Sequence, residues 1–148
     1  GTFAVPADIN SYNLDSSANI DLVKKMVVAF ETGDSATYRS LYADSAIFHD
    51  NGSDMTLDQN VVLFNYFKSN NVTVKVEKVD PIWEIVNKEA SPNGITNYVM
   101  SFQHTVYKKG DKEVKVIVSV VNGIKDGKIV EEWDLYNAKP MFDLMSQK

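Results

Sequence analysis

Hydrophobic residues in the first half of the chain recur every three or four positions, the spacing that places them on one side of an α-helix. Asn19 is expected to cap the first helix and Gly33 to end it, and Asp34 is expected to cap the second. Thr56 and Gln59 have the spacing of a capping box at the start of the third. The hydrophobic positions of these helices are Ile20, Val23, Met26, Val27, Phe30, Tyr38, Leu41, Tyr42, Leu57, Val61, Phe64 and Phe67.

The second half of the chain alternates between hydrophobic and polar residues, which is the pattern of β-strands. A short strand is also expected earlier, at 46–50, before an Asn51-Gly52 turn. Pro81 predicts a bend or bulge within 72–86. Three long strands joined by hairpin turns are then expected at 95–107, 113–124 and 128–137. Helices followed by a strand meander predict an α+β fold, in which an antiparallel sheet packs on three N-terminal helices.

The strand at 114–121 reads VKVIVSVV and is hydrophobic on both faces, so both faces are expected to be covered. Helices would cover one face. The other would be covered by a second copy of the chain or by the N-terminal arm, residues 1–18, which is polar and shows no periodicity. We expect a single domain over 19–148 and a homodimer through the outer sheet face. The residues expected in that contact are Val99, Ile117, Val121 and Trp133.

The composition narrows the classes of partner. The 148 residues include 15 Lys and Arg against 20 Asp and Glu, a net charge of −5 without a basic cluster, so nucleic acid is not an expected partner. No hydrophobic run approaches the ~20 residues of a membrane span, so no membrane partner is expected. The absence of Cys excludes thiolate chemistry. The chain begins with Gly1, which suggests a trimmed N-terminus and leaves export or a cytoplasmic location open.

Three segments resemble one superfamily. They are FETGDSATYRSLYADSAIFHDNG at 30–52, YVMSFQH at 98–104 and DGKIVEEWDLY at 126–136. Their order and spacing are similar to the nuclear transport factor 2-like superfamily, in the branch of SnoaL-like polyketide cyclases and ketosteroid isomerase. The resemblance covers residues 20 to 148. It implies a cone that encloses a pocket for a small hydrophobic molecule.

The resemblance also implies a set of site residues. Asp50 matches the position at which ketosteroid isomerase carries its general-base carboxylate, and burial at a pocket mouth is expected to raise its pKa. His104 and Asp134 are the other catalytic candidates, because strand alternation and the resemblance place them on cavity-facing sides. His49 is expected to point outward. The expected ligand-binding residues are Met26, Phe30, Phe48, Tyr98, Met100, Phe102, Glu132 and Tyr136.

Each candidate has a structural alternative. Asp50 could cap the Asn51-Gly52 turn, and His104 could be a hydrogen-bonded core histidine. Glu132 and Asp134 become surface charges if the register is one residue off.

The chain also departs from ketosteroid isomerase. The oxyanion-hole tyrosine of ketosteroid isomerase falls on Met26, and its protonated Asp falls on Ser119 or Val120, which disfavours that steroid chemistry. The segment around Asp50 does not match a calcium loop, so no metal is expected.

Three functions remain open. The first is a cofactor-independent isomerase, cyclase, dehydratase or hydrolase that acts on a small hydrophobic molecule, with Asp50 as its base. The second is a non-catalytic protein that binds such a molecule in the same pocket. The third is a dimeric association module that uses its open sheet face. One fold can host all three.

Overall fold

The computed structural model describes residue 4 and residues 10–147. Seven strands form one sheet in the order β1-β4-β5-β6-β7-β2-β3. The strands are β1 (Ser11–Leu14), β2 (Tyr42–Asp50), β3 (Ser53–Thr56), β4 (Thr73–Asn87), β5 (Asn97–Lys109), β6 (Lys112–Lys125) and β7 (Lys128–Leu135). The helices are α1 (Ala18–Thr32), α2 (Ser35–Ser40), α3 (Leu57–Ser69) and α4 (Lys139–Met145).

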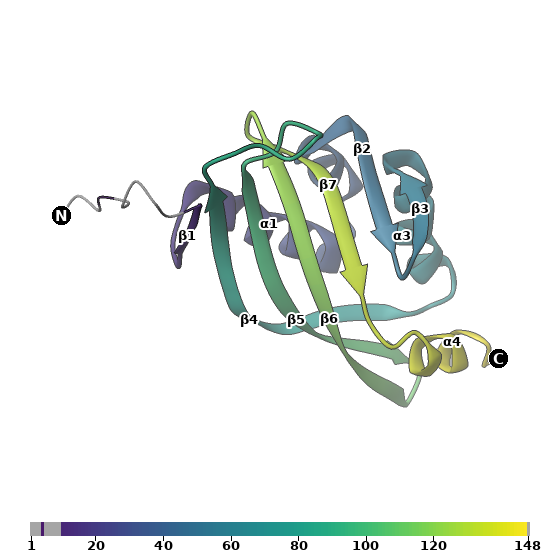
Figure 1. The fold of residues 1–148 in the computed structure, drawn as a ribbon. Helices are drawn as coiled ribbons and strands as arrows, with labels where there is room; N and C mark the ends of the chain where they lie inside the picture. Colours follow the sequence, from purple (N-terminus) through teal and green to yellow (C-terminus); the bar gives the residue numbers. More distant parts are fainter. Residues whose placement is uncertain (1–3, 5–9, 148) are drawn as a thin grey trace.

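The expected α+β architecture is confirmed. The sheet is curved, and helices α1 and α3 lie on one side of it, as Figure 1 shows. Neighbouring strands are antiparallel except β2 and β7, which pair in parallel. The first long strand, β4, is continuous, but its pairing with β5 shifts around Pro81, where the sequence predicted a bulge. No described helix is long and apolar enough to cross a membrane.

The core lies between the helices and the inner face of the sheet. Ile20 and Val23 on α1 are fully buried against Phe48 of β2 and Val99 of β5, within one continuous hydrophobic cluster. A smaller cluster joins α4 to the far ends of β5 and β6 through Leu144 and its neighbours. The helices that the hydrophobic spacing predicted therefore bury the faces that it predicted.

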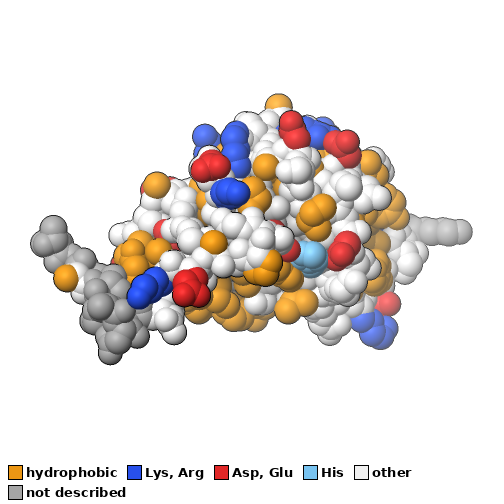
Figure 2. Space-filling model, turned by 45° about the horizontal axis from the view of Figure 1, so that its top comes forward, with side chains coloured by type: hydrophobic (Ala, Val, Ile, Leu, Met, Phe, Trp, Pro, Cys, Tyr) orange, Lys and Arg blue, Asp and Glu red, His pale blue; other side chains and the backbone are white. Residues whose placement is uncertain are grey.

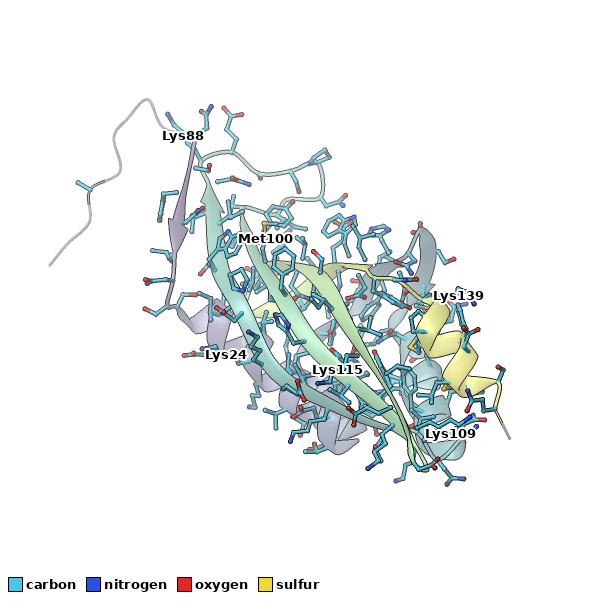
Figure 3. All side chains as sticks on the ribbon, turned by 90° about the horizontal axis from the view of Figure 1, so that it is seen from below. Lys24, Lys88, Met100, Lys109, Lys115 and Lys139 are labelled. Atoms are coloured by element: carbon cyan, nitrogen blue, oxygen red, sulfur yellow. The ribbon has the colours of Figure 1, made fainter. Side chains whose placement is uncertain are left out.

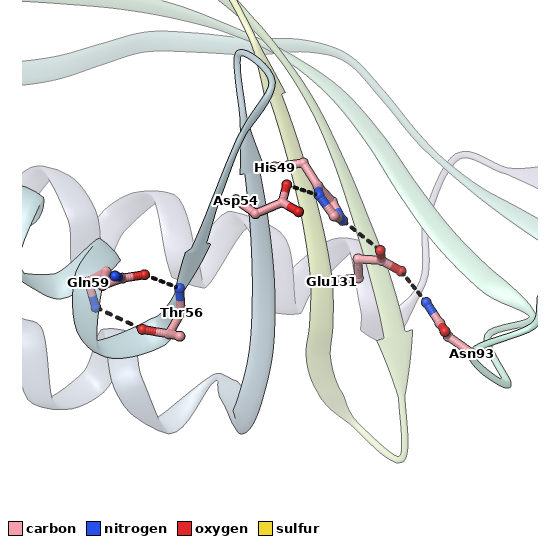
Figure 4. A network of polar contacts seen from close by, with 6 residues as sticks. All are labelled: His49, Asp54, Thr56, Gln59, Asn93 and Glu131. Atoms are coloured by element: carbon pink, nitrogen blue, oxygen red, sulfur yellow. Dashed lines mark hydrogen bonds and ion pairs between the residues drawn. The ribbon is translucent and has the colours of Figure 1, made fainter.

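The helix ends follow the sequence closely. Thr56 and Gln59 form the predicted capping box, whose two hydrogen bonds are drawn in Figure 4. Helix α1, however, begins two residues earlier than expected, because Ser17 accepts the capping hydrogen bond from Ile20. Asn19 instead donates to the buried Glu84 of β4 at 2.7 Å and so holds the start of α1 against the sheet.

Three short elements were not predicted. β1 lies within the expected N-terminal arm and pairs with the edge of β4, so residues 11–14 extend the sheet and do not cover its outer face. β3 pairs with β2 across the Asn51-Gly52 turn. Helix α4 follows the last strand and packs on β6. The first nine residues of the expected arm, other than residue 4, lie outside the described part of the chain.

A β-bulge in β7 reverses one part of the predicted facing. Ile124 pairs with Ile129, but Gly123 pairs with Glu131, so Val130 is an extra residue in β7. Because side chains alternate along a strand, one extra residue moves all later partners to the opposite face. Ile129, which would share the outer face with Trp133 in a regular strand, is therefore fully buried on the inner side. Trp133 and its β6 partner, Val121, lie on the outer face, as predicted.

Met100 faces outward with them, because it pairs directly with Val121. The prediction that the β5 face of Tyr98, Met100, Phe102 and His104 points into the cone was wrong. The prediction that Val99 lies on the outer face was wrong for the same reason, because Val99 is fully buried on the inner side.

Candidate functional site

A cavity of about 540 Å³ opens between the inner face of the sheet and helices α1, α3 and α4. Its polar groups come mainly from the strands, and its apolar wall comes mainly from the helices. The polar lining residues are Asp50, Asn51, Ser53, Asn60, Gln103, Thr105, Glu132 and Asp134. The aromatic and methionine lining residues are Met26, Phe30, Tyr38, Met55, Phe64, Tyr66, Phe67, Tyr107, Tyr136, Met141, Phe142 and Met145.

Six of the predicted site residues line this cavity. They are Met26, Phe30, Asp50, Glu132, Asp134 and Tyr136. Asp50 and Asp134 lie side by side, because β2 and β7 pair in parallel with these two residues in register. The sheet therefore brings together carboxyl groups that are 84 residues apart in the sequence. Their placement agrees with the sequence analysis, and their chemical roles stay predictions.

Five predicted residues do not line the cavity. Phe48 points inward as expected, but it is fully buried in the core and packs on Tyr42, with ring centroids 5.0 Å apart. Tyr98, Met100 and Phe102 lie on the outer face of β5. His104 shares that outer face, and its Nε2 lies 3.0 Å from the carbonyl oxygen of Asp80.

His104 therefore cannot reach the carboxyl groups of the cavity. Inner and outer positions of β5 are both rich in uncharged residues, so hydrophobicity did not separate them. The inner face of β5 carries Gln103 and Thr105, because the strand lines a cavity and not a closed core at that point.

Glu132 and Asp134 form a buried acidic pair. Glu132 is 5% exposed, and its Oε1 accepts hydrogen bonds from the Tyr42 hydroxyl and the Asn122 Nδ2, each at 2.6 Å. Burial raises the pKa of Glu132, and these donors act against the rise. Burial, the Glu132 charge and a hydrogen bond to Glu132 hold the pKa of Asp134 well above its usual range. The raised pKa of Asp134 therefore favours its protonated form more than in an ordinary aspartate.

Asp50 is in a different environment. It is half-buried, and its Oδ1 accepts a hydrogen bond of 2.8 Å from the Tyr136 hydroxyl. Burial raises the pKa of Asp50, in the direction expected from the sequence, and the Tyr136 hydrogen bond opposes the rise. The cavity thus contains two aspartates of increased proton affinity, Asp50 with a tyrosine donor and Asp134 beside Glu132. Such an arrangement can accept a proton at one place and supply one at another.

Asn51 fixes the geometry around Asp50. Its side chain makes two reciprocal hydrogen bonds with the backbone of Tyr136, each 3.0 Å long. Its backbone N–H donates to the carbonyl oxygen of Asp134 at 2.9 Å. Asn51 adopts a left-handed conformation with φ of 47°, which Asn tolerates better than most residues. The turn that was predicted from Asn51-Gly52 therefore also positions the tyrosine that donates to Asp50.

Two buried tyrosines, Tyr38 and Tyr42, extend the hydrogen-bond network beyond Glu132. The Tyr38 hydroxyl accepts from Asn60 at 2.7 Å and interacts with Tyr42, whose hydroxyl donates to Glu132. The Oδ1 of Asn122 has no protein partner although it is buried. Sequence reasoning assigned Tyr38 and Tyr42 only to the core. The positions of Tyr38 and Tyr42 in the sequence did not indicate that their hydroxyl groups form hydrogen bonds. Only tertiary packing places both hydroxyl groups toward Glu132.

The opposite face of the same strands carries a second polar cluster. His49 points outward, as predicted, and lies 2.7 Å from both Asp54 Oδ1 and Glu131 Oε2. It also stacks on Trp133, with ring centroids 5.0 Å apart. Hydrogen bonds to Glu131 and then to Asp54 raise the pKa of His49. Figure 4 shows this chain, which continues from Glu131 to Asn93.

Among the described residues, no group of three or more His, Asp or Glu side chains could hold a metal ion.

The comparisons with known proteins concern the fold. No protein-family model matches the chain, and a search of curated proteins found no match. The solved structures include an LEH-like epoxide hydrolase of M. tuberculosis, which is 19% identical with a TM-score of 0.66 and covers 89% of this chain and 92% of its own. IdmH, a candidate polyketide cyclase of Streptomyces antibioticus, is 14% identical with a TM-score of 0.64 and covers 89% and 100%.

A third solved structure carries the name of the superfamily. It is an NTF2-like protein of unknown function from Cytophaga hutchinsonii, which is 13% identical with a TM-score of 0.53 and covers 87% of this chain and 97% of its own. Similarity at this level of identity establishes architecture and not activity. The chain has the nuclear transport factor 2-like fold, as the three sequence segments indicated.

Proposed function

We propose that the cavity is the active site of a cofactor-independent enzyme that moves a proton to or from a small, largely apolar molecule. The observation that carries this proposal is the unequal pair of environments on one cavity wall. Asp50 is partly buried, has a raised pKa and accepts a hydrogen bond from Tyr136, whereas the pKa of Asp134 beside Glu132 is held well above its usual range. General acid–base catalysis needs both kinds of group within reach of one substrate. The reaction class is isomerisation, cyclisation, dehydration or hydrolysis.

In this proposal Asp50 is the base. Tyr136 holds its carboxylate in one orientation, and Asn51 holds Tyr136 in turn. Asp134 provides the neutral donor that stabilises negative charge or returns a proton. The solved structures of similar fold support this reading, because an epoxide hydrolase and a candidate polyketide cyclase are among them. Both reactions act on small molecules.

The test is a screen that needs no prior substrate. Small apolar ketones would be incubated with the protein in D₂O and followed by NMR for exchange of C–H protons, and matching epoxides would be followed for hydrolysis. Asp50→Asn is expected to reduce any such rate by about 10²–10⁴-fold, the usual contribution of a general base. Glu113→Gln, which removes an exposed charge on β6, should leave the rate unchanged. An Asp50→Asn variant with full activity would contradict the proposal.

A non-catalytic ligand-binding protein is the second candidate. The observation that favours it is the flexible apolar wall, to which Met26, Met55, Met141 and Met145 contribute. Methionine side chains adapt to ligands of different shape and supply no chemistry. Tight binding of a small apolar molecule, without turnover of any member of the screen, would favour this function over the first.

We also propose that two copies of the chain associate through the outer face of the sheet. Ile117 is 56% exposed there, and Leu135 is 59% exposed. Trp133 and Val121 lie on the same face, and hydrophobic side chains gather on the side of the molecule shown in Figure 2. A monomer rarely exposes a large apolar patch. Light scattering should therefore give a dimer, and Ile117→Glu should give a monomer; a monomeric parent protein would contradict the proposal.

A further inference from the structure

The charged side chains that line the cavity are all acidic. Three carboxyl groups face it, and the described residues that line it include no Lys, Arg or His. The lysines labelled in Figure 3 lie along the outside of the molecule, on helix α1, on the strands and at the C-terminal end. A cavity of this kind repels anions and attracts cations, because its apolar wall weakens the screening by water.

Two lysines at the C-terminal end of the molecule are already engaged. The ammonium group of Lys109 donates to the carbonyl oxygens of Met145, the last residue of α4, and of Gln147. Lys139 pairs with Asp143 one turn along the same helix, at 2.9 Å. Neither lysine lines the cavity. The described residues that line the cavity therefore supply no positive charge to balance its carboxyl groups.

Hydrogen bonds indicate where negative charge is favoured. Tyr42 and Asn122 both donate to Oε1 of Glu132, which favours its ionised form. When Glu132 and Asp50 are both ionised, the cavity wall carries two negative charges. Two like charges beside one apolar cavity are costly to maintain unless a ligand compensates them.

The rest of the lining suits an organic cation. Aromatic rings surround the cavity from α1, α3, α4 and β5, and ring faces attract cations electrostatically. Two of these rings, on Tyr66 and Phe142, are 49% and 64% exposed, so aromatic surface is available to an entering ligand. The aromatic residues concerned are Phe30, Phe64, Tyr66, Phe67, Tyr107 and Phe142.

We propose that the ligand of this cavity is a small molecule with an apolar body and a protonated amine, whose ammonium group lies against Asp50 and the Glu132–Asp134 pair. This inference rests on the proposed function only in using the same cavity. A catalyst and a non-catalytic binding protein would show the same preference for a cation, so the two proposals can fail separately.

Three probes with the same rigid body test the preference. Adamantane-1-methylamine, adamantane-1-methanol and adamantane-1-carboxylate are a cation, a neutral donor and an anion. Binding would be measured by isothermal titration calorimetry at pH 7. The amine is expected to bind at least about tenfold more tightly than the alcohol, which is about 1.4 kcal/mol, and the carboxylate is expected to bind most weakly. Equal affinities for amine and alcohol, tightest binding of the carboxylate, or no binding of the amine would overturn the inference.

Substitutions test which carboxyl group causes the preference for the amine. Asp50→Asn should remove most of the advantage of the amine, because it should reduce the affinity for the amine much more than the affinity for the alcohol. Glu113→Gln makes the same change in net charge on an exposed part of β6 and should leave the advantage intact. If Asp50→Asn does not fold, the unmodified protein provides the test at lower pH, where protonation of the carboxylates should reduce the advantage of the amine. An advantage that is insensitive to pH would overturn the inference.

Amine preference without any turnover in the exchange and hydrolysis screen would remove the enzyme proposal and leave this inference standing. Turnover of neutral ketones or epoxides without amine preference would do the reverse.

Discussion

The paired strands β2 and β7 present two acidic clusters, one on each face of the sheet. On the inner face, Asp50, Glu132 and Asp134 meet without a cation, and burial raises the pKa of each. On the outer face, His49 lies between Asp54 and Glu131, and both carboxylates raise the pKa of the histidine. Residues that are neighbours in the sequence, such as Glu131 and Glu132, thus belong to different electrostatic environments.

The carboxylates of the two clusters have different partners. The outer cluster has opposite charges within hydrogen-bonding distance and is partly exposed, so it joins three strands at little cost. The inner cluster lacks an opposite charge and is held by neutral donors instead. The net contribution of side chains arranged in this way to the free energy of folding is small. Their proton affinity is unusual, which is typical of functional sites.

The largest expected difference between the clusters is in stability. Glu132→Ala leaves the buried donors of Tyr42 and Asn122 without an acceptor, and each unsatisfied group costs about 1–3 kcal/mol. We expect the free energy of unfolding to fall by about 2–5 kcal/mol in urea denaturation at pH 7. Glu131→Ala is the matched control on the outer face and should cost about 1 kcal/mol or less. Equal losses in the two variants would contradict the distinction.

The second difference is in the pH dependence of stability. Because the pKa of Asp134 is raised on folding, the folded state binds more protons than the unfolded state, and the free energy of unfolding falls as pH rises above the ordinary carboxyl range. Asp134→Asn keeps a neutral donor beside Glu132 and should flatten the decline in denaturation curves measured from pH 4 to 8.

His49 needs a separate control in that experiment. Its raised pKa has the same sign of effect, since its stabilisation is present below the ordinary pKa of histidine and is lost as pH rises through the folded-state value. His49→Gln should remove a contribution centred at the titration of the histidine and leave the part due to Asp134. A decline that vanishes in His49→Gln and persists in Asp134→Asn would assign the whole effect to the outer face.

The smallest expected effect concerns the pKa of Asp50. Tyr136→Phe removes the donor to the Asp50 carboxylate, so the pKa of Asp50 should rise further, as measured by carbon-detected NMR titration. Asn51→Gly preserves the left-handed turn but removes both hydrogen bonds to the Tyr136 backbone, and it should cause a smaller rise. Asn51→Gly with no change in the pKa of Asp50 would show that Tyr136 is positioned by its other contacts.

Much of the fold was predictable because it depends on local patterns. The helical spacing of Ile20, Val23 and Phe64 predicted buried faces, and all three are buried. The capping box at Thr56 and the bulge near Pro81 were likewise predicted from a few adjacent residues. The short elements β1, β3 and α4 were not, since four to seven residues provide too few repeats of a period to recognise.

The candidate site was only partly predictable. Asp50, Glu132 and Asp134 were placed on the cavity side through a family resemblance, and the structure places them there. The prediction that His104 faces the cavity was wrong, because the facing of β5 was inferred from its hydrophobicity. Met100 pairs with Val121, which was expected on the outer face, so the register between β5 and β6 decided the facing of β5. That register is set by the hairpin between the two strands and not by the hydrophobicity of β5.

The sequence by itself determined the order of helices and strands, the one-sided hydrophobic faces of the helices and the net negative charge, because each depends on residue type and spacing. Tertiary structure alone decided which carboxyl groups meet. Asp50 and Asp134 become neighbours only through the parallel pairing of β2 with β7, and Tyr42 reaches Glu132 across 90 residues of sequence. Proton affinity depends on burial and on the charges within a few ångströms, and those distances exist only after the chain has folded.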